Sequence, residues 1–380
     1  MEQLSNVENR AKKEYSRKSF ELLLREIISN ALHSVLLSKE AKEPKIDIII
    51  KIENDIKISI TDNGEGFTEK NFSYFKELDS INIEKENAHY NPRGQGRLAL
   101  IYFSNRASYK SIYEQGNIFY ERKFHYPLLQ GGLFESSDVN EANTNILSTE
   151  LSIIISSHEK LRRANTFFNI NYNCDLFKGW IINNFFALLI DDTHKNIEIH
   201  IEINNNKCRL DTNKIKENLE KVDFDLKSNE DDKIYKFYIW IIKIESGKTS
   251  HLDVKICSRG LLTKFNNKEA LPYEISLNAK YALYLTSEYL DQRTNNTGDN
   301  VEVFEKDILL IEDNIKENLD KHFKETIEKN RDKSKLNFQN YVKNYPSLGL
   351  FIDEANISNS NLIKENKDFI KESINCSKSR

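Results

Sequence analysis

A run of alternating isoleucines constrains the fold more than any other feature of this sequence. In KIDIIIKIENDIKISITDNGEGF, isoleucine occupies every second position from 46 to 52 and again from 56 to 60, and the residues END lie between the two runs. Such alternation gives each strand one apolar face, and a short polar connection joins the strands as a hairpin. The second strand leads directly into Asp62 and two glycines. We therefore predict a half-buried β-hairpin that ends in a tight turn.

The stretch REIISNALHS, residues 25–34, predicts a buried helix with an unusual polar side. At about 100° per residue, Glu26, Asn30 and His33 share one side, opposite a broad apolar stripe. Because leucines frame this acid, amide and imidazole, they indicate a helix that faces a lined cavity. The alternative is an ordinary solvated polar stripe. The apolar stripe consists of Phe20, Leu24, Ile27, Ile28, Ala31 and Val35.

Glycine is scarce in this chain, so two closely spaced pairs stand out. Four of the 12 glycines are Gly64, Gly66, Gly94 and Gly96. Since glycine costs chain entropy, such pairs mark places where the backbone turns sharply or approaches another group closely. Asp62 could accept a hydrogen bond from a ligand amine while the first pair leaves room for a flat ring. The alternative is a simple turn, since Asp-Asn-Gly is favourable turn chemistry.

The second pair lies in NPRGQGRLAL, residues 91–100, which has the character of a phosphate-binding loop. Its glycines free backbone N–H groups, and the helix predicted to start near Arg97 directs its positive end at an anion. A single GxG is not specific by itself. The GxxxxGK[ST] pattern is missing, which excludes a Walker-type site, and no preceding strand of a βαβ unit supports a dinucleotide site.

Helices and strands segregate along the chain without a regular βαβ repeat, which predicts the α+β class. Residues 1–164 are predicted to form an α/β sandwich and residues 165–300 a second α/β domain. Residues 301–380 are predicted to form a long charged helix and a polar tail. The broken apolar stripe of this helix favours packing along a neighbour or against a second subunit.

The composition indicates a globular chain and argues against several classes of protein. Hydrophobic residues make up 39% and charged residues 30%, and 59 acidic against 55 basic residues give a net charge of -4. This net charge gives no overall positive field that would attract nucleic acid. A local basic patch is left as the alternative. The longest apolar run, WIINNFFALLI, is short and interrupted by two asparagines, and the N-terminus has no apolar secretion signal, so we expect neither membrane spanning nor secretion.

The cysteines are far apart and form no CxxC pair. This spacing predicts neither a zinc site nor a disulfide framework, and it fits a reducing cytoplasm. The four cysteines are Cys174, Cys208, Cys257 and Cys376.

The order of the motifs is more specific than any one of them. A helix with E-x-x-x-N, a hairpin ending in D-x-G-x-G, a variable segment and a GxG that opens a helix follow one another. This set resembles the GHKL ATPase superfamily of gyrase B, the ninety-kilodalton heat-shock chaperone, sensor histidine kinases and MutL mismatch-repair proteins. LLREIISNAL is similar to the chaperone's first box. The resemblance is strong over residues 15–110 and weaker up to about 300, and it implies a Bergerat-type ATP-binding sandwich followed by a transducer-like domain.

The resemblance implies a role for each matching residue. Glu26 would be the general base that activates the attacking water, Asn30 would ligate Mg²⁺, and Asp62 would accept a hydrogen bond from the adenine amine. Gly66, with Gly64 before it, would let the adenine ring lie close to the backbone. The phosphates of ATP would be held by Gly94, Gly96 and the N–H groups of Arg97 and Leu98.

At other positions the sequence matches the family pattern less closely. Residues 67–93 would form a lid that excludes water from the nucleotide. His33 stands where many members carry an acid, and a structural histidine is the favoured interpretation. Arg97 stands where a lysine or phenylalanine is common, and it would touch a phosphate or cap a surface. In related ATPases a transducer base reaches the terminal phosphate. Arg293 is the first candidate for it and Lys280 the second, with a solvated surface base as the alternative.

These implications favour a slow Mg²⁺-dependent ATPase whose lid closure couples to homodimerisation and to a protein partner. One alternative is a chaperone-like or antiviral-defence subunit in which ATP switches the conformation offered to an effector protein. Another is a MutL- or gyrase-like DNA clamp, which the slight acidity and the lack of an endonuclease motif disfavour. A histidine kinase is least expected, because no phosphoacceptor helix precedes residue 15. Glu26 argues against binding without turnover.

Overall fold

The computed structural model describes residues 2–38, 43–76, 96–126, 138–190, 196–295, 298 and 300–329, together with a few positions between 332 and 340. These residues form two compact units. The first comprises Met1–Glu217 and two later segments, Cys257–Thr263 and Thr294–Asp299. The second comprises Asn218–Ile256, Lys264–Arg293 and Asn300–Arg380.

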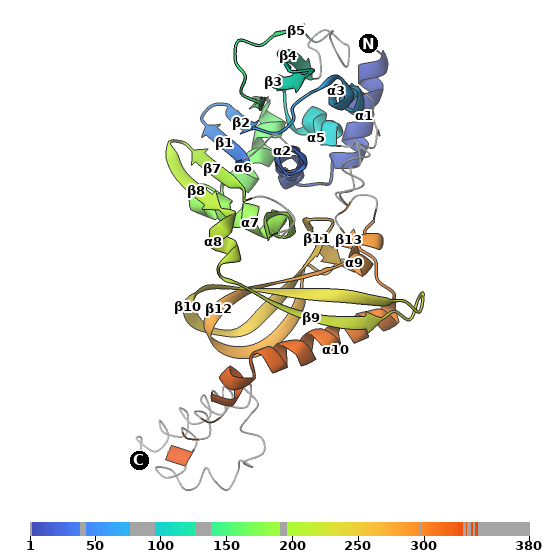
Figure 1. The fold of residues 1–380 in the computed structure, drawn as a ribbon, viewed down its shortest axis with the longest axis vertical. Coiled ribbons are helices and arrows are strands. Elements are labelled where there is room, and N and C mark those ends of the chain that lie inside the picture. Colours follow the sequence, from blue (N-terminus) through green and yellow to red (C-terminus); the bar gives the residue numbers. More distant parts are fainter. Residues whose placement is uncertain are drawn as a thin grey trace, which may run out of the picture. The chain divides into compact units, whose positions relative to one another are not determined.

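A mixed sheet forms the centre of the first unit (Figure 1). Within the described residues it has eight strands in the order β5-β4-β3-β6-β2-β1-β7-β8. Neighbouring strands are antiparallel except for β1 and β7, which run parallel. The strands are β1 (Lys45–Ile52), β2 (Ile56–Asp62), β3 (Arg106–Gln115), β4 (Ile118–Tyr126), β5 (Asp138–Glu141), β6 (Ser148–Ile155), β7 (Glu198–Ile203) and β8 (Asn206–Asp211).

The predicted isoleucine hairpin is present as β1 and β2. Ile48 lies opposite Ile60, and Ile50 lies opposite Ile58, so the isoleucines of both strands share one face of the sheet. That face is buried, with these four residues at most 2% exposed. Because successive side chains of a strand alternate between the two faces, Asp62 falls on the same buried face. The alternation that forms the hairpin therefore also directs its terminal carboxylate inward.

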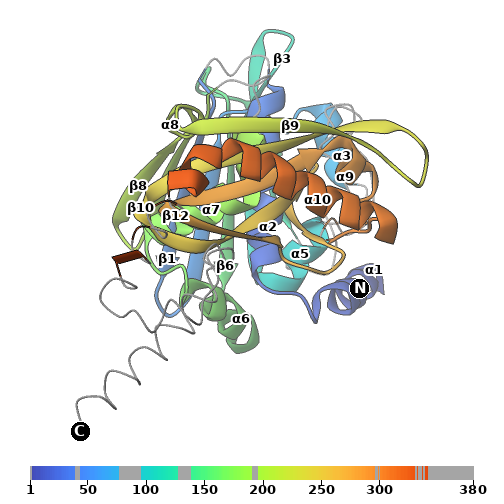
Figure 2. The same ribbon diagram turned by 90° about the horizontal axis from the view of Figure 1, so that it is seen from below.

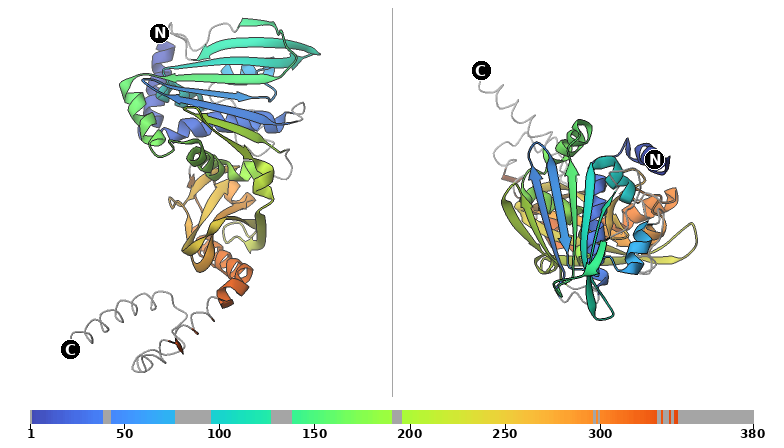
Figure 3. Two further views of the ribbon diagram at one scale, coloured as in Figure 1. Left: turned by 90° about the vertical axis from the view of Figure 1, so that its left-hand side faces the viewer. Right: turned by 90° about the horizontal axis from the view of Figure 1, so that it is seen from above.

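Helices pack on this buried face. Helix α2 contacts β1 and β2, and α7 contacts β7 and β8; Figure 3 shows the strands side by side with helices against them. Leu23 and Ile28 of α2, Ile58 of β2 and Phe177 of α7 belong to one hydrophobic core. The helices are α1 (Glu2–Tyr15), α2 (Glu21–Leu37), α3 (Glu69–Lys76), α5 (Gly96–Phe103), α6 (His158–Phe168), α7 (Cys174–Ile190) and α8 (Thr212–Lys216).

A second sheet dominates the second unit, with the strand order β12-β10-β11-β13 and with β9 paired to β10. Helix α10 lies across this sheet (Figure 2). It contributes Ile311, Ile315 and Leu319 to the core, and their spacing of four places them on one side of the helix. The elements are β9 (Leu219–Lys227), β10 (Ile234–Ser258), β11 (Leu261–Phe265), β12 (Leu271–Ser287), α9 (Glu288–Gln292), β13 (Asn300–Val301) and α10 (Glu305–His322).

The mixed helix-and-strand architecture with two sheets agrees with the predicted class, but the units divide the chain at another place. The predicted boundary at residue 164 falls inside the first unit, because β7 pairs with β1 and α7 packs in the same core. The predicted third segment is not separate, since Asn300–Arg380 belongs to the second unit and α10 packs in its core. No helix among the described residues is long and apolar enough to cross a membrane.

Candidate functional site

Helix α2 provides one wall of the candidate site. Its apolar stripe is buried as predicted, with Ile28 and Val35 fully inaccessible. On the opposite side, Glu26 is half-buried and Asn30 is exposed, whereas His33 is only 5% exposed. The polar side of α2 is therefore not a uniformly solvated stripe, and part of it faces other protein groups.

Asp62 is the last residue of β2 and is 6% exposed. Its Oδ1 accepts a hydrogen bond from the backbone N–H of Gly64 at 3.0 Å. This is the local turn that the Asp-Asn-Gly sequence predicts. An ionised carboxylate has about four lone-pair sites on its two oxygens. The role of Asp62 in this turn therefore does not prevent it from accepting a further hydrogen bond from a ligand.

Gly64 and Gly66 lie where the backbone approaches other groups too closely for a side chain. A Cβ atom on Gly64 would lie 2.1 Å from Oγ and 2.4 Å from the backbone carbon of Ser34, so the turn is pressed against α2. Gly66 has a φ of +75°, and a Cβ atom there would lie 2.6 Å from Oγ of Ser111 on β3. Only glycine adopts such a conformation without strain. The two glycines thus fix the turn after β2 between α2 and β3.

Gly96 joins the second glycine pair to α2. It is the first residue of α5, and a Cβ atom on it would lie 2.6 Å from Oε2 of Glu26. Two motifs far apart in the sequence are therefore neighbours. The positive dipole end of α5 opens beside this carboxylate and attracts its negative charge. Gly94 and residues 77–93 of the predicted lid lie outside the described residues.

Arg97 and Leu98 follow Gly96 in α5 and are both buried, at 6% and 1% exposure. The guanidinium of Arg97 donates a hydrogen bond to the carbonyl oxygen of Phe75 and lies 5.4 Å from the centroid of the Phe75 ring. Phe75 belongs to α3, the described part of the predicted lid. Burial raises the pKa of Tyr126 to about 12, against the opposing charge of Arg97. The side chain of Arg97 is thus an internal contact to α3, and the predicted surface cap does not form.

A row of buried polar side chains, which no sequence motif indicates, crosses four neighbouring strands. Asp62 on β2 lies opposite Thr149 on β6, and Thr149 lies opposite Ser111 on β3. Ser111 in turn lies opposite Arg122 on β4. The hydroxyl oxygens of Ser111 and Thr149 are 3.0 Å apart, and Ser111 Oγ accepts a hydrogen bond from the N–H of Phe67 at 2.9 Å. We call Asp62, Thr149, Ser111 and Arg122 the buried polar row; each is at most 9% exposed.

The buried polar row leads from Asp62 to helix α3. Arg122 forms an ion pair with Glu69 at the start of α3, and its guanidinium carbon lies 4.2 Å from the centroid of the Phe72 ring. Polar groups on a buried sheet face are costly unless they are paired, and the members of this row have hydrogen-bond or ion-pair partners. The sequence signal for the row is weak, because each member is a single polar residue within an ordinary strand pattern.

The two predicted transducer bases belong to the second unit. Nε and Nη2 of Arg293 lie 2.8 Å and 2.7 Å from Oε2 of Glu230, and its guanidinium carbon lies 3.6 Å from the centroid of the Tyr289 ring. The Arg293 side chain is 12% exposed, so these contacts hold it within that unit. Lys280 is exposed on β12, where its backbone lies opposite that of Glu245 in β10.

A different basic residue, Arg259, belongs to the first unit. The segment Cys257–Thr263 belongs to this unit, and Arg25 of α2 donates a hydrogen bond to the carbonyl oxygen of Leu262 at 2.7 Å. Arg259 has a φ of +51° and Gly260 a φ of +82°, so the chain turns sharply between β10 and β11. Arg259 therefore lies on a tight turn in a segment that is attached to α2 at the position next to the predicted general base. No local sequence pattern singled it out.

Comparison with known proteins identifies the fold. The sequence matches no protein-family model and no curated protein. The structure is similar to that of the N-terminal domain of a DNA repair protein, with a TM-score of 0.52 and 13% identity over 83% of this chain and 98% of that one. Two structures of the ATPase region of Saccharomyces cerevisiae topoisomerase II, one bound to dexrazoxane, match with TM-scores of 0.42 and 0.40. Both share 10% identity over 76% of this chain and 78% of theirs. The first likeness shows a shared fold.

Proposed function

We propose that this chain is a Mg²⁺-dependent ATP-binding and hydrolysing protein of the GHKL type that acts as a clamp. The observation that carries this proposal is the approach of Gly96 to the carboxylate of Glu26, because it joins the first and third sequence motifs at one place. The second motif packs against the same helix through Gly64 and Ser34. Three motifs that resemble one family thus meet along α2.

The side chains at this place suit ATP and Mg²⁺. Asp62 is an inward-facing acceptor for an exocyclic amine, and the buried hydroxyls of Thr149 and Ser111 lie beside it in the buried polar row. Asn30 offers an amide oxygen on an exposed part of α2, and oxygen is the ligand atom that Mg²⁺ prefers. The N-terminal N–H groups of α5 suit phosphate oxygens. When bound, Mg²⁺ would neutralise phosphate charge during hydrolysis.

Glu26 would orient the attacking water and accept its proton. Glu26 is half-buried and lies next to the start of α5, whose positive dipole end attracts a carboxylate. Arg97 would link the phosphates to the lid, since its backbone N–H opens α5 while its side chain holds Phe75 of α3. The ring of Phe103, at the other end of α5, lies 6.0 Å from the ring of Tyr15 in α1. This contact supports coupling between nucleotide binding and the N-terminal helix.

The test is Mg²⁺-dependent phosphate release from ATP by the wild type and by two glutamate variants. Glu26→Ala should retain nucleotide binding and lose at least about 100-fold in turnover, the contribution typical of a positioned general base. Glu150→Ala is the matched control. Glu150 is also partly buried, but it lies on the face of the first sheet that is opposite to the face covered by α2. Asp62→Asn should weaken binding. Equal turnover by Glu26→Ala and the wild type, or no nucleotide binding at all, would overturn the proposal.

The base that contacts the terminal phosphate can be identified by comparing variants. We propose Arg259 as a candidate beside Arg293 and Lys280, because its segment is attached to α2. Loss of turnover in Arg259→Ala with little change in Arg293→Ala would assign the role to Arg259. The reverse result would support Arg293, whose contacts with Glu230 would then have to break.

We also propose that ATP drives homodimerisation and presents a surface to a protein partner. Light scattering should show the mass doubling when a non-hydrolysable ATP analogue is added with Mg²⁺. A DNA clamp is the second candidate, which the fold shared with the N-terminal domain of a DNA repair protein favours. A DNA affinity that falls steeply with added salt would support the DNA clamp. If the protein binds no DNA, the alternative of an ATP-driven switch that acts on a protein effector is favoured.

A further inference from the structure

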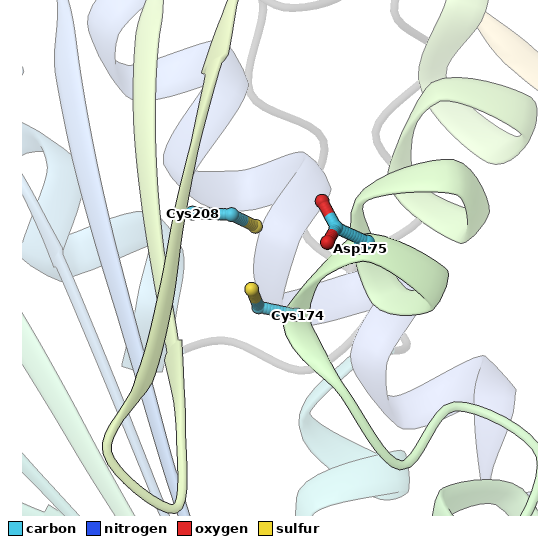
Figure 4. A group of neighbouring side chains, drawn as sticks. All are labelled: Cys174, Asp175 and Cys208. Carbon is cyan, nitrogen blue, oxygen red and sulfur yellow. The ribbon is translucent and has the colours of Figure 1, made fainter.

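Two cysteines that are far apart in the sequence meet at the edge of the first sheet (Figure 4). Cys174 is the first residue of α7, and Cys208 lies in β8, the edge strand. The pairing of β8 with β7 and the packing of α7 on both strands bring these residues together. Asp175, the next residue of α7, points to the same place. One atom from each of the three side chains, two thiol sulfurs and a carboxylate oxygen, lies within 4.8 Å of the others.

We propose that Cys174, Cys208 and Asp175 form a binding site for a thiophilic divalent metal ion of the Zn²⁺ class. Zn²⁺ binds sulfur at about 2.3 Å and carboxylate oxygen at about 2.0–2.2 Å, so two ligands of a tetrahedral ion lie roughly 3.5–4 Å apart. The three donor atoms are therefore close enough to share one ion after small side-chain movements. Two soft sulfurs and one carboxylate select Zn²⁺ over Mg²⁺ or Ca²⁺, which prefer sets of oxygen ligands.

The surroundings of the cluster support binding rather than simple packing of two small apolar side chains. Cys174 is 1% exposed, Cys208 is half-buried and Asp175 is exposed, so the site has a dry interior and an open side. The open side can admit an ion and a water molecule as fourth ligand. Cys174 Sγ donates a hydrogen bond to Oδ1 of Asn206, the first residue of β8, at 3.0 Å, so this sulfur faces β8.

Binding releases protons and needs no oxidant or reductant. Both thiols give up their protons to solvent as two metal–sulfur bonds form, and the ionised Asp175 supplies the third bond. The two negative sulfurs then balance the charge of the ion.

Lys178 lies one helical turn after Cys174 and provides an internal test. Its Nζ is 2.9 Å from Oδ1 of Asp175, so its positive charge and a metal ion would compete for the same carboxylate. Replacing Lys178 by methionine should therefore tighten metal binding severalfold. A purely structural cluster would show no such gain.

Such an ion would fasten α7 to β8. Edge strands present unpaired backbone groups and have a neighbour on one side only, so an added link is most useful there. Because metal bound only by the folded state stabilises that state, thermal unfolding should shift upward with added metal. This effect is independent of the proposed ATP site, and the two proposals can fail separately.

Titration of the reduced, chelator-treated protein with Co²⁺ tests the proposal, because Co²⁺ bound by thiolates gives sulfur-to-metal charge-transfer absorption. We expect this absorption to saturate at one Co²⁺ per chain and to disappear on addition of excess Zn²⁺. Cys174→Ser and Cys208→Ser should lose it. Asp175→Asn, an exposed change that spares the fold, should weaken binding. Cys257→Ser is the matched control and should keep the absorption.

Two results would overturn the proposal. The first is the absence of charge-transfer absorption from the reduced wild type. The second is absorption that persists in the Cys174→Ser, Cys208→Ser double variant, which would place the metal elsewhere.

Discussion

The contact between Gly64 and α2 yields a prediction about stability that does not depend on any ligand. In Gly64→Ala, the new Cβ atom would lie 2.1 Å from Oγ of Ser34, 2.4 Å from its backbone carbon and 2.5 Å from its backbone oxygen. A side-chain atom alone could rotate away, but the helix backbone cannot move without disturbing the core. Overpacking of this kind costs about 1–3 kcal/mol, and the backbone clash places Gly64→Ala at the upper end, about 3 kcal/mol.

Two other glycines calibrate this magnitude, because a Cβ atom on either would meet nothing within 4 Å. Gly116 has a φ of +62°, so Gly116→Ala should cost about 1–2 kcal/mol through left-handed strain alone. Gly179 lies inside α7, where alanine is the better helix former, so Gly179→Ala should stabilise by about 0.5–1 kcal/mol. From the most to the least stable, the predicted order is Gly179→Ala, wild type, Gly116→Ala and Gly64→Ala.

The two tryptophans allow each unit to be measured separately. Trp180 lies in α7 of the first unit and Trp240 in β10 of the second, and the chain has no others. In a Trp240→Phe background, fluorescence during urea unfolding reports the first unit, and linear extrapolation gives its free energy of unfolding. If Gly64→Ala is no less stable than Gly116→Ala, the turn after β2 is not pressed against α2 and the arrangement of the site is wrong.

Two further predictions use the same assay. Glu69→Ala should destabilise the first unit by about 1.5–3 kcal/mol, since it removes the carboxylate that accepts a hydrogen bond from the buried Arg122 guanidinium. Arg122→Met should cost less, because Glu69 is largely exposed and methionine can fill the buried position. Equal losses would contradict this. In the second unit, burial opposes ionisation of Asp307, but hydrogen bonds from Tyr289, Asn229 and Ser228 outweigh it and lower its pKa. Asp307→Asn should therefore lose about 1.5–3 kcal/mol at pH 7. With Trp240 as the reporter, the difference from wild type should persist above about pH 4 and vanish as the pH falls through the lowered pKa. A stability difference between Asp307→Asn and the wild type that does not change with pH would refute the lowered pKa of Asp307.

Local periodicity made part of the fold predictable. The isoleucine hairpin, the helix over residues 25–34 and the start of α10 follow from patterns with periods of two or about four residues. The order of the motifs named Glu26 and Gly96 as candidate site residues, and the structure places them beside each other. Strand pairing was not predictable in the same way. A strand pattern shows which face is buried and not which strand lies next to it, so the boundary near residue 164 could not anticipate the pairing of β7 with β1.

The sequence by itself determined the local elements, the glycine positions and the inward direction of Asp62, because alternation and turn chemistry act over a few residues. Only the tertiary structure decided which distant residues meet. It aligned the buried polar row across four strands, attached the segment of Arg259 to the first unit and brought Cys174 to Cys208. The physical reason is that these contacts depend on strand register and on burial of apolar faces between segments far apart in the chain. No window of sequence contains both partners of such a contact.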